Sequence, residues 1–280
     1  MLGVKNMLKI TFQGTSGAYS HIACCNLFPD AYYIASDTFE EAMEMVENDI
    51  ADYAVIPVEN SNAGRVADVH FLLSQTGLSI VGEYFLRVEH QLLGLSDAEL
   101  SDISVAASHP QALAQCSGFL KKHSIKAIGE IDTAKSCERI VEKQDKTKAA
   151  IASKLAGEIY GLKVLASNIE NDINNTTRFL VMKKTKVMPM YDGGVFITSL
   201  LFKVKHIPSA LYKALGGFAT NGLNLNKIES YVVDGNFVSA QFYVEVEAHP
   251  YTKEYKNALE ELEFYSQSVT WLGTYKKCIK

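Results

Sequence analysis

Residues 174–179, NNTTRF, place two amides, two hydroxyls and a guanidinium directly before the apolar residues 179–182. Amide, hydroxyl and guanidinium groups all donate hydrogen bonds to carboxylates, and a guanidinium can do so with two parallel bonds. The segment can therefore bind a small molecule that carries more than one acid group. The same residue types are also common in tight turns, so this segment alone does not decide between a binding site and a turn.

Three further polar segments follow short apolar runs. The first is GTSGAYSH, residues 14–21. Its glycines allow backbone N–H groups to approach an anion, and Ser16 or Ser20 can cap the helix that follows. An ordinary strand-to-helix turn would look the same, because the segment lacks the lysine of a P-loop and the third glycine of a dinucleotide-binding motif.

The second segment is VIPVENSNAGRV, residues 55–66, in which an apolar strand runs into Glu59, Asn60 and Ser61. A carboxylate, an amide and a hydroxyl at the end of a strand can line a pocket. In the alternative interpretation, Ser61 or Asn62 caps the next helix and Glu59 lies at the surface.

The third segment, ASHPQALAQC, places Ser108 and His109 before a helix that carries Gln111 and Gln115 on one face. A single histidine is more often structural than catalytic, so His109 is not assigned as a general base. The four segments together predict a pocket rich in hydroxyls and amides, without an evident Ser-His-Asp set, Cys-His nucleophile or zinc-binding histidine pair. Such a pocket suits a reaction that needs anion binding and one proton donor, and it does not suit hydrolysis.

The elements that must position these segments alternate between strand and helix up to residue 182. Thr38 and Glu41 form a capping box, and Pro110 suits the first turn of a helix. This alternation indicates an α/β protein with mostly parallel sheets and ligands at the carboxyl ends of the strands. We expect strands at 8–12, 32–34, 53–58, 79–85, 104–107 and 149–152, and helices at 20–28, 38–46, 66–73, 110–123, 133–142 and 153–160.

The composition changes at residues 184–194, where charge, proline and a glycine pair without a sustained period predict a linker. Beyond it the expected order is strand, helix, strand, strand, helix, strand, with a hairpin turn at Asp234-Gly235. This βαββαβ order is ferredoxin-like. The predicted strands are 195–204, 225–232, 237–246 and 269–275, and the predicted helices are 209–220 and 252–265. We therefore divide the chain into domains 1–183 and 195–280.

Composition excludes several classes of function. A chain of 280 residues with a net charge of -5, and with basic residues clustered only near 183–186, is unlike a nucleic-acid-binding or membrane-surface protein. No apolar run approaches the length of a membrane span and the first residues do not resemble a signal peptide, so we expect a cytoplasmic protein. Five cysteines without a C-x-x-C pair predict reduced thiols rather than a disulfide framework or a zinc site.

With these motifs in place, the chain resembles the prephenate dehydratase family. The resemblance rests on GTSGAYSH, on PVENS at 57–61, on SHPQAL at 108–113 and on TRF at 177–179, in this order. It implies a bilobal catalytic region like that of type II periplasmic binding proteins, and the conversion of prephenate to phenylpyruvate, water and carbon dioxide without a cofactor or a metal. The C-terminal unit resembles the family's regulatory ACT domain, which implies a homodimer or homotetramer.

The resemblance gives the proton-donating role to the threonine before Arg-Phe. We expect Thr177 to hydrogen-bond the departing hydroxyl and to donate the proton, alone or through water. Arg178 can bind a substrate carboxylate, and it can equally form a structural ion pair. The expected catalytic residues are Thr177, Glu59 and Ser108. The expected substrate-binding residues are Ser16, Asn60, Ser61, Gln115, Arg178 and Phe179.

The regulatory part departs from the family's pattern. The family typically has Pro-Gly-Ala-Leu before the first helix of its phenylalanine-binding unit and Glu-Ser-Arg-Pro after the second strand. This chain has Pro208-Ser209-Ala210-Leu211 and Glu229-Ser230-Tyr231-Val232 at those places. Serine in place of glycine adds a side chain where the backbone normally approaches the ligand. We expect L-phenylalanine to bind at an interface between two such units, with Asn221, Leu223 and Asn224 helping to line the pocket.

Two alternatives remain open. An arogenate dehydratase would perform the same elimination on a substrate with an amino group in place of the keto oxygen. A binding protein without catalysis would use the same bilobal fold and ACT unit to sense an amino acid.

Overall fold

The computed structural model describes residues 7–232 and 240–278 and divides into two compact units. One unit consists of residues 1–69 and 84–179, and the other of residues 70–83 and 180–280. Residues 70–83 thus pack with the C-terminal part of the chain, although they lie within its N-terminal half. Among the described residues, no helix combines the length and the apolar character that crossing a bilayer requires.

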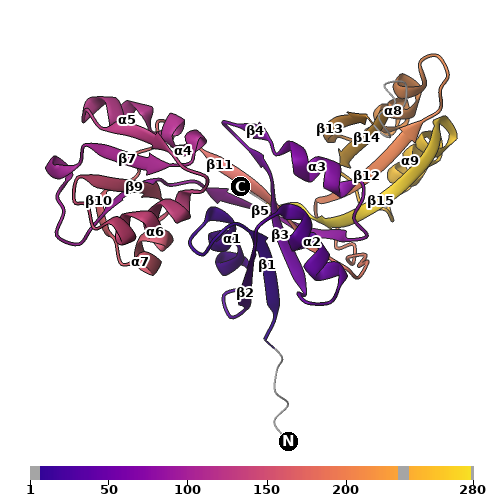
Figure 1. Cartoon of the computed structure of the whole chain (residues 1–280). Coiled ribbons are helices and arrows are strands. Elements are labelled where there is room, and N and C mark those ends of the chain that lie inside the picture. Colours follow the sequence, from indigo (N-terminus) through magenta and orange to yellow (C-terminus); the bar gives the residue numbers. More distant parts are fainter. Residues whose placement is uncertain (1–6, 233–239, 279–280) are drawn as a thin grey trace, which may run out of the picture. The chain divides into compact units, whose positions relative to one another are not determined.

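The first sheet has the strand order β2-β1-β3-β11-β5, with β4 paired to β3. The strand β1 pairs in parallel with β2 and β3, as the strand–helix alternation predicts. Helices α1 (Tyr19–Leu27) and α2 (Phe39–Glu47) lie on opposite sides of this sheet, and Thr38 and Glu41 form the predicted capping box at the start of α2 (Figure 1). The strands are β1 Lys9–Gln13, β2 Tyr32–Ser36, β3 Tyr53–Asn60, β4 Gly64–Arg65, β5 Ser79–Arg87 and β11 Thr176–Lys183. The short helix α3 spans Ala67–Leu73.

The start of α1 differs from the prediction. Ala18 is the N-cap and no side chain caps the helix, so the expectation that Ser16 or Ser20 does so is wrong. The Gly17 N–H instead donates to His21 Nδ1 at 3.0 Å. This bond fixes the turn before α1, although Gly17 precedes the N-cap and the bond is not a helix cap.

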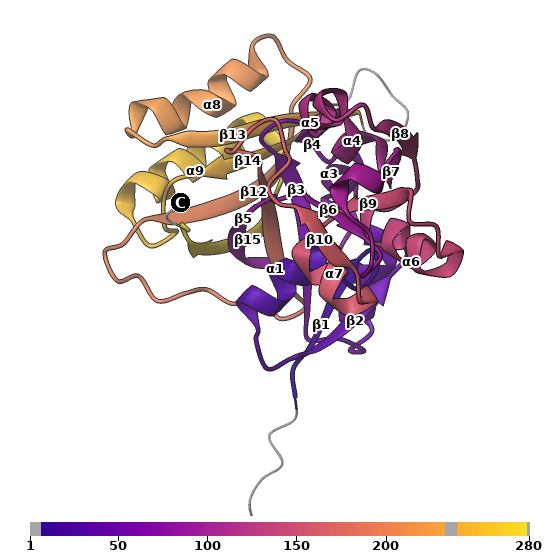
Figure 2. The same ribbon diagram turned by 90° about the vertical axis from the view of Figure 1, so that its left-hand side faces the viewer.

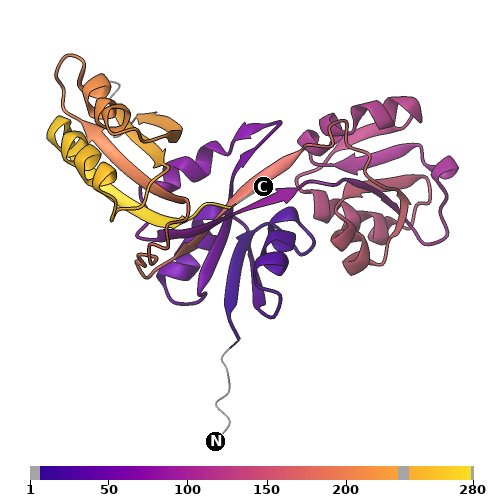
Figure 3. The same cartoon turned by 180° about the vertical axis from the view of Figure 1, so that it is seen from behind.

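The second sheet has the strand order β10-β6-β9-β7-β8. Strand β7 is parallel to β8 and β9, whereas β6 is antiparallel to β9 and β10. Helices α4 and α5 lie on one side of the sheet, and α6 and α7 lie on the other (Figure 1 and, from behind, Figure 3). The strands are β6 Gln91–Gly94, β7 Val105–Ser108, β8 Lys126–Gly129, β9 Lys148–Ala152 and β10 Lys163–Ala166, and the helices are α4 Pro110–Gln115, α5 Ser117–Lys122, α6 Thr133–Lys143 and α7 Lys154–Tyr160.

The helix expected at 110–123 is interrupted at Cys116, which separates α4 from α5. Asn171 explains the interruption. Its side chain accepts a hydrogen bond from Gly118 N at 3.0 Å and donates one to Ala114 O at 3.1 Å. Its backbone N–H donates to Gln115 O at 2.6 Å. Backbone groups that would continue one helix are thus bonded to a residue far along the chain.

The C-terminal unit confirms the predicted βαββαβ order, and its sheet has the strand order β13-β14-β12-β15. All three pairings in this sheet are antiparallel. Figure 2 shows α8 and α9 side by side, and their apolar residues pack against Leu200, Phe202 and Val244 of the sheet. The predicted turn at Asp234-Gly235 lies outside the described residues. The elements are β12 Phe196–Val204, α8 Ala210–Thr220, β13 Leu225–Val232, β14 Ala240–Val246, α9 Lys253–Tyr265 and β15 Ser266–Lys276.

Gly273 of β15 provides a test of packing within the C-terminal unit. A Cβ atom at this position would overlap the backbone of Ile80 in β5, whereas a Cβ at Gly216 in α8 would meet nothing within 4 Å. We expect Gly273→Ala to lower the free energy of unfolding by about 1–3 kcal/mol, because the two strands must separate. Gly216→Ala, the control, should raise it by about 0.5–1 kcal/mol, because alanine favours a helix interior. Chemical denaturation measures both, and equal stability of the two variants would contradict the close approach.

Candidate active site

A cavity of about 310 Å³ lies in the first unit, and residues from the elements of both sheets line it. From the first sheet and its loops come Gln13, Tyr19, Pro57, Asn60, Val66 and Thr177; from the segment after β5 come Val88 and His90; and from α4, α6 and the residues before α6 come His109, Gln111, Ala112, Gln115, Ile131, Asp132 and Thr133. Gln13 and Asn60 end the parallel strands β1 and β3, so the cavity lies at the carboxyl edge that the sequence pattern predicts.

Asn60 determines how the Thr177 hydroxyl can act. Asn60 Oδ1 accepts hydrogen bonds from the backbone N–H groups of Asn62 and Ala63, both at 3.0 Å. Those two donors fix the amide orientation, so Asn60 Nδ2 is the atom that faces Thr177 Oγ1, at 3.0 Å. The threonine oxygen is the acceptor in that bond. Its own hydrogen therefore remains available to another acceptor.

The hydrogen-bonded chain continues from Asn60 along the cavity wall. Asn60 Nδ2 also donates to Asn175 Oδ1 at 2.9 Å, and Asn175 Nδ2 donates to Gln115 Oε1 at 3.1 Å. His90 Nε2 lies 2.9 Å from the same oxygen. An amide oxygen can only accept hydrogen bonds, so His90 Nε2 must be the donor in its contact with Gln115 Oε1. Neither contact uses Gln115 Nε2, which is left to donate elsewhere.

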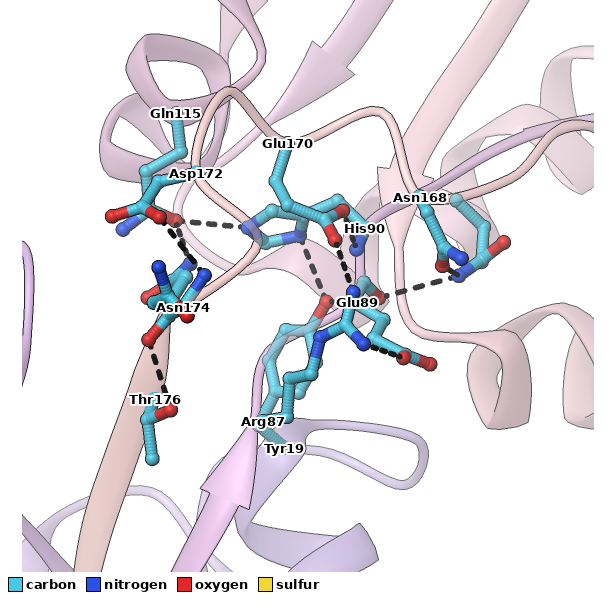
Figure 4. Close-up of polar contacts among 12 residues, drawn as sticks. Tyr19, Arg87, Glu89, His90, Gln115, Asn168, Glu170, Asp172, Asn174 and Thr176 are labelled. Atoms are coloured by element: carbon cyan, nitrogen blue, oxygen red, sulfur yellow. Dashed lines mark hydrogen bonds and ion pairs between the residues drawn. The ribbon is translucent and has the colours of Figure 1, made fainter.

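His90 and Tyr19 form the far end of this chain (Figure 4). Tyr19 Oη lies 2.8 Å from His90 Nδ1 and 2.9 Å from Glu89 O, so its hydrogen is shared between two acceptors. Burial lowers the pKa of His90, which favours the neutral ring with one donor and one acceptor nitrogen. Burial likewise raises the pKa of Tyr19 well above its ordinary value, so the phenol stays protonated.

Glu170 holds the backbone of this region. The backbone N–H of His90 donates to Glu170 Oε2 at 2.9 Å, and Arg87 Nη2 lies 3.6 Å from Glu170 Oε1 (Figure 4). The Glu170 side chain is only 2% exposed, so this ion pair is partly shielded from water. The segment after β5 is therefore anchored where it carries His90 into the cavity wall.

Asp132 and His109 begin the helices of the second sheet that face the cavity. Asp132 Oδ1 caps α6 by accepting from Ala134 N at 2.7 Å and Lys135 N at 3.0 Å. His109 Nδ1 accepts from Gln111 N at 3.3 Å, so the proton of the neutral ring lies on Nε2. Among the described residues that line the cavity, Asp132 is the one carboxylate and there is no lysine or arginine.

The segment NNTTRF, residues 174–179, combines a turn with part of the cavity wall. Asn174 and Thr176 form the turn, in which Asn174 N donates to Asp172 Oδ1 at 2.9 Å and Thr176 Oγ1 donates to Asn174 O at 3.0 Å. The alternate residues, Asn175 and Thr177, join the hydrogen-bonded chain of the cavity. Thr176 and Thr177 begin β11, where neighbouring side chains point to opposite faces, so the two threonines have different roles.

The structure brings Thr177, Asn60 and Gln115 together around the cavity and places the other expected site residues elsewhere. Ser108 is fully buried, and its hydroxyl donates to Ile151 O at 2.6 Å in the neighbouring strand. Ser16 is exposed. Neither is among the residues that line the cavity.

Ser61 and Glu59 lie beside the cavity rather than in its lining. The Ser61 hydroxyl accepts from Thr176 N at 3.0 Å and donates to Asn174 O at 3.3 Å, which ties the end of β3 to the start of β11. Glu59 is partly buried in β3 and pairs in register with Arg65 of β4. Both residues thus hold the end of β3, where Asn60 lies.

Arg178 and Phe179 are also not part of the lining. Arg178 is 8% exposed, and its guanidinium lies 5.9 Å from the centre of the Phe85 ring. Phe179 is 1% exposed and belongs to the core cluster with Phe12 and Val55. Because side chains alternate along a strand, Arg178 faces the opposite side from Thr177.

Tyr19, His90, Asp132 and Asn175 are among the site residues that were not predicted from the sequence. Tyr19 and Asn175 lie inside the motifs GTSGAYSH and NNTTRF, next to residues that were predicted. Asp132 carries the ordinary signal of a helix cap before the helix predicted at 133–142. His90 follows a predicted strand at some distance, and no local pattern marks it.

The expected allosteric residues lie at two places in the C-terminal unit. Pro208, Ser209, Ala210 and Leu211 surround the start of α8, where Ser209 is the N-cap with φ 60. The other group follows α8 and continues along β13, which is an edge strand of the sheet. In this group Asn221 Nδ2 donates to Gly217 O at 2.8 Å, and Glu247 N donates to Asn224 O at 2.9 Å. Its members are Asn221, Leu223, Asn224, Glu229 and Ser230.

No disulfide joins the cysteines among the described residues, and Cys24, Cys116 and Cys137 are buried. Within the described part of the chain, no group of three or more His, Cys, Asp or Glu side chains is arranged to hold a metal ion.

Comparison with known proteins shows which family the chain matches. Residues 10–187 match the family described as prephenate dehydratase. The chain is 42% identical over 266 residues to a bifunctional N-acyl-homoserine lactone acylase/prephenate dehydratase of Komagataeibacter europaeus, covering 95% of each chain. It is 37% identical over 287 residues to arogenate dehydratase/prephenate dehydratase 1 of Arabidopsis thaliana, covering 98% of this chain and 73% of the relative.

Among solved structures, the chain is similar to a prephenate dehydratase from Arthrobacter aurescens in complex with L-Phe. The TM-score is 0.89 at 27% sequence identity, and the match covers 96% of this chain and 90% of the other. The similarity spans both units of the fold.

Proposed function

Because the chain belongs to the prephenate dehydratase family, we propose that it catalyses the decarboxylating dehydration of prephenate to phenylpyruvate. The observation that carries the proposal is the hydrogen bond from Asn60 Nδ2 to Thr177 Oγ1, because it leaves the threonine hydrogen for a substrate. Thr177 lines the cavity, so that hydrogen can meet a bound ligand.

The reaction needs one proton and no electron acceptor. Prephenate carries a hydroxyl on one ring carbon and, on the opposite ring carbon, a carboxylate and a pyruvyl side chain. Protonation of the hydroxyl oxygen allows its C–O bond to break, and water leaves. The C–C bond to the ring carboxylate breaks, its electron pair completes the aromatic ring, and carbon dioxide leaves. Aromatisation supplies the driving force, so the balanced reaction requires no cofactor.

Thr177 is the proposed proton donor. A positioned general acid contributes about 10²- to 10⁴-fold to a rate. A free hydroxyl is a weak acid, and the Asn60 N–H compensates because it points at Thr177 Oγ1, where negative charge develops as the proton leaves. The proton is then replaced from solvent.

The amides and the imidazole of α4 are the proposed partners of the substrate carboxylates. Gln115 uses Oε1 for its two protein contacts, so Nε2 can donate to a ligand. His109 uses Nδ1 to cap α4, so Nε2–H can donate in the same way. Gln111 lies one turn from Gln115 and also lines the cavity.

An ultraviolet assay for phenylpyruvate tests the proposal. The purified chain should convert prephenate to phenylpyruvate in the absence of added metal or cofactor, whereas a sensor without catalysis would form no product. The activity on N-acyl-homoserine lactones that the Komagataeibacter relative carries in its name is a separate question, which the same preparation answers with such a lactone as substrate.

Arogenate is a second candidate substrate. The Arabidopsis relative, 37% identical over 98% of this chain, has arogenate dehydratase as the first part of its name. Arogenate undergoes the same elimination, and only the side chain opposite the hydroxyl differs. Comparison of kcat/KM for both substrates determines the preference.

We further propose that the C-terminal unit is an ACT regulatory domain that binds L-phenylalanine between two copies of the chain, in a homodimer or homotetramer. Support comes from the βαββαβ order and from the similar Arthrobacter aurescens structure, which holds L-Phe. Phenylalanine should raise the unfolding temperature and lower the rate of phenylpyruvate formation. No response in either measurement would leave the unit as a dimerisation element.

Ser209 gives a prediction for this unit. Its φ of 60 lies in the left-handed region, which is unfavourable for a residue with a side chain and is open to glycine. We expect Ser209→Gly to stabilise the protein by up to about 1 kcal/mol, because the gain is partly offset by a more flexible unfolded chain. Ser209→Val should destabilise it by about 1–2 kcal/mol. Chemical denaturation compares the wild type with the Gly and Val variants. A Val variant as stable as the Gly variant would contradict the left-handed backbone conformation at position 209.

A further inference from the structure

The carboxylate of Asp132 is held rigidly, with one oxygen uncommitted. Oδ1 accepts three hydrogen bonds, from Ala134 N at 2.7 Å, Lys135 N at 3.0 Å and Thr15 Oγ1 at 3.1 Å. Oδ2 has no hydrogen-bond partner among the described residues, and Asp132 lines the cavity. The helix cap therefore fixes the direction of a negative charge that the protein itself does not neutralise.

The charges of the residues that line the cavity determine which ligand groups Asp132 Oδ2 attracts. No lysine or arginine is among the described residues that line the cavity. Apart from the two lining histidines, the described lining has no group that can carry a positive charge, so a permanent cation that pairs with Asp132 must come with the ligand. An ammonium group is such a cation, and it donates three hydrogen bonds. A keto oxygen can only accept hydrogen bonds, and it meets a carboxylate without attraction.

The shape of the substrate allows its side chain to reach the side of the cavity to which Asp132 belongs. In prephenate and arogenate the hydroxyl and the three-carbon side chain lie on opposite carbons of the ring. Thr177 belongs to β11 of the first sheet, and Asp132 precedes α6, which covers the second sheet (Figure 1). With the hydroxyl at Thr177, the side chain can therefore extend toward the wall formed by the second sheet.

We propose that Asp132 is a specificity-determining residue that receives the ammonium group of arogenate, so that this cavity accepts the amino-acid substrate as well as the keto acid. The inference rests on the proposed dehydratase function and adds the side chain that discriminates between its two substrates. For prephenate the same carboxylate faces a dianion and opposes its binding. The two substrates thus respond to this charge in opposite directions.

Asp132→Asn tests the inference because asparagine caps a helix as well as aspartate does. The Asn oxygen can accept from Ala134 N and Lys135 N as before, while the charge is lost. We expect kcat/KM for arogenate to fall about 10-fold or more, since one close ion pair in a partly shielded site is removed. We expect kcat/KM for prephenate to rise.

Two further variants distinguish the charge at position 132 from a general change in surface charge and from loss of the helix cap. Glu130→Gln removes the same charge two residues earlier, but Glu130 pairs with Arg139 and is not part of the cavity lining, so the ratio of the two kcat/KM values should stay as in the wild type. Asp132→Ser retains a capping hydroxyl and should repeat the effect of Asp132→Asn. Thermal unfolding of each variant checks that the fold persists.

The outcomes separate the inference from the function on which it rests. An unchanged ratio in Asp132→Asn, or an equal fall with both substrates, would overturn the inference and leave the dehydratase function in place. Turnover of prephenate without any turnover of arogenate by the wild type would do the same. No turnover of either substrate would overturn the proposed function, and the inference with it.

Discussion

Replacing Thr177 with alanine is expected to lower kcat for prephenate about 10²- to 10⁴-fold, since the proposed general acid is lost while the strand around it is unchanged. Thr177→Ser should retain much of the activity, because it keeps a hydroxyl that can accept from Asn60 Nδ2 and donate to the substrate. Steady-state assays of phenylpyruvate formation at saturating prephenate measure both variants.

The matched control for this prediction is Thr176→Ala. Thr176 precedes Thr177 in β11, and its hydroxyl donates to Asn174 O within the turn rather than lining the cavity. It should keep kcat close to the wild-type value. Near-normal kcat in a folded Thr177→Ala protein would show that the proton comes from another group.

Replacing Asn60 with aspartate is expected to lower kcat about 10²- to 10³-fold, although the two side chains have nearly the same shape. One carboxylate oxygen can still accept from Asn62 N and Ala63 N. The other takes the place of Nδ2 and can only accept, so Thr177 must donate its hydrogen to this oxygen instead of to the substrate. The polarity of the hydrogen bond is thereby reversed.

Asn62→Asp is the control for charge, since Asn62 is exposed and lies two residues further along the same loop. It should change kcat far less than Asn60→Asp. Steady-state formation of phenylpyruvate measures both variants, on proteins with matching thermal unfolding. Equal losses in the two variants would mean that added negative charge, rather than the direction of the Asn60–Thr177 bond, governs the rate.

The order of the helices and strands could be predicted because it depends on local sequence patterns. Alternating strands and helices, the Thr38 capping box and the C-terminal βαββαβ order all depend on residues close together in the chain. The interruption at Cys116 could not be predicted, because it depends on hydrogen bonds to Asn171. The short strands β6, β8 and β10 were missed for a similar reason, since their pairing partners lie elsewhere in the sequence.

The candidate site could be predicted in part. Motifs indicated which segments meet, and Thr177, Asn60 and Gln115 do line one cavity. They did not indicate which side chains of a segment face it. Ser108 turns to the neighbouring strand and Phe179 to the core, and both outcomes depend on how the strands are placed in their sheets. The sequence indicates that Asp132 caps a helix. Only the structure shows that its second carboxylate oxygen has no hydrogen-bond partner among the described residues and that Asp132 lines the cavity.

The most direct test of the central claim is a crystal structure of the Thr177→Ala protein with prephenate bound. We predict that the ring hydroxyl lies within hydrogen-bonding distance of Asn60 Nδ2, in the space left by the threonine hydroxyl, with the pyruvyl side chain extending toward Asp132. Prephenate bound with its hydroxyl remote from position 177, or bound outside this cavity, would contradict the account.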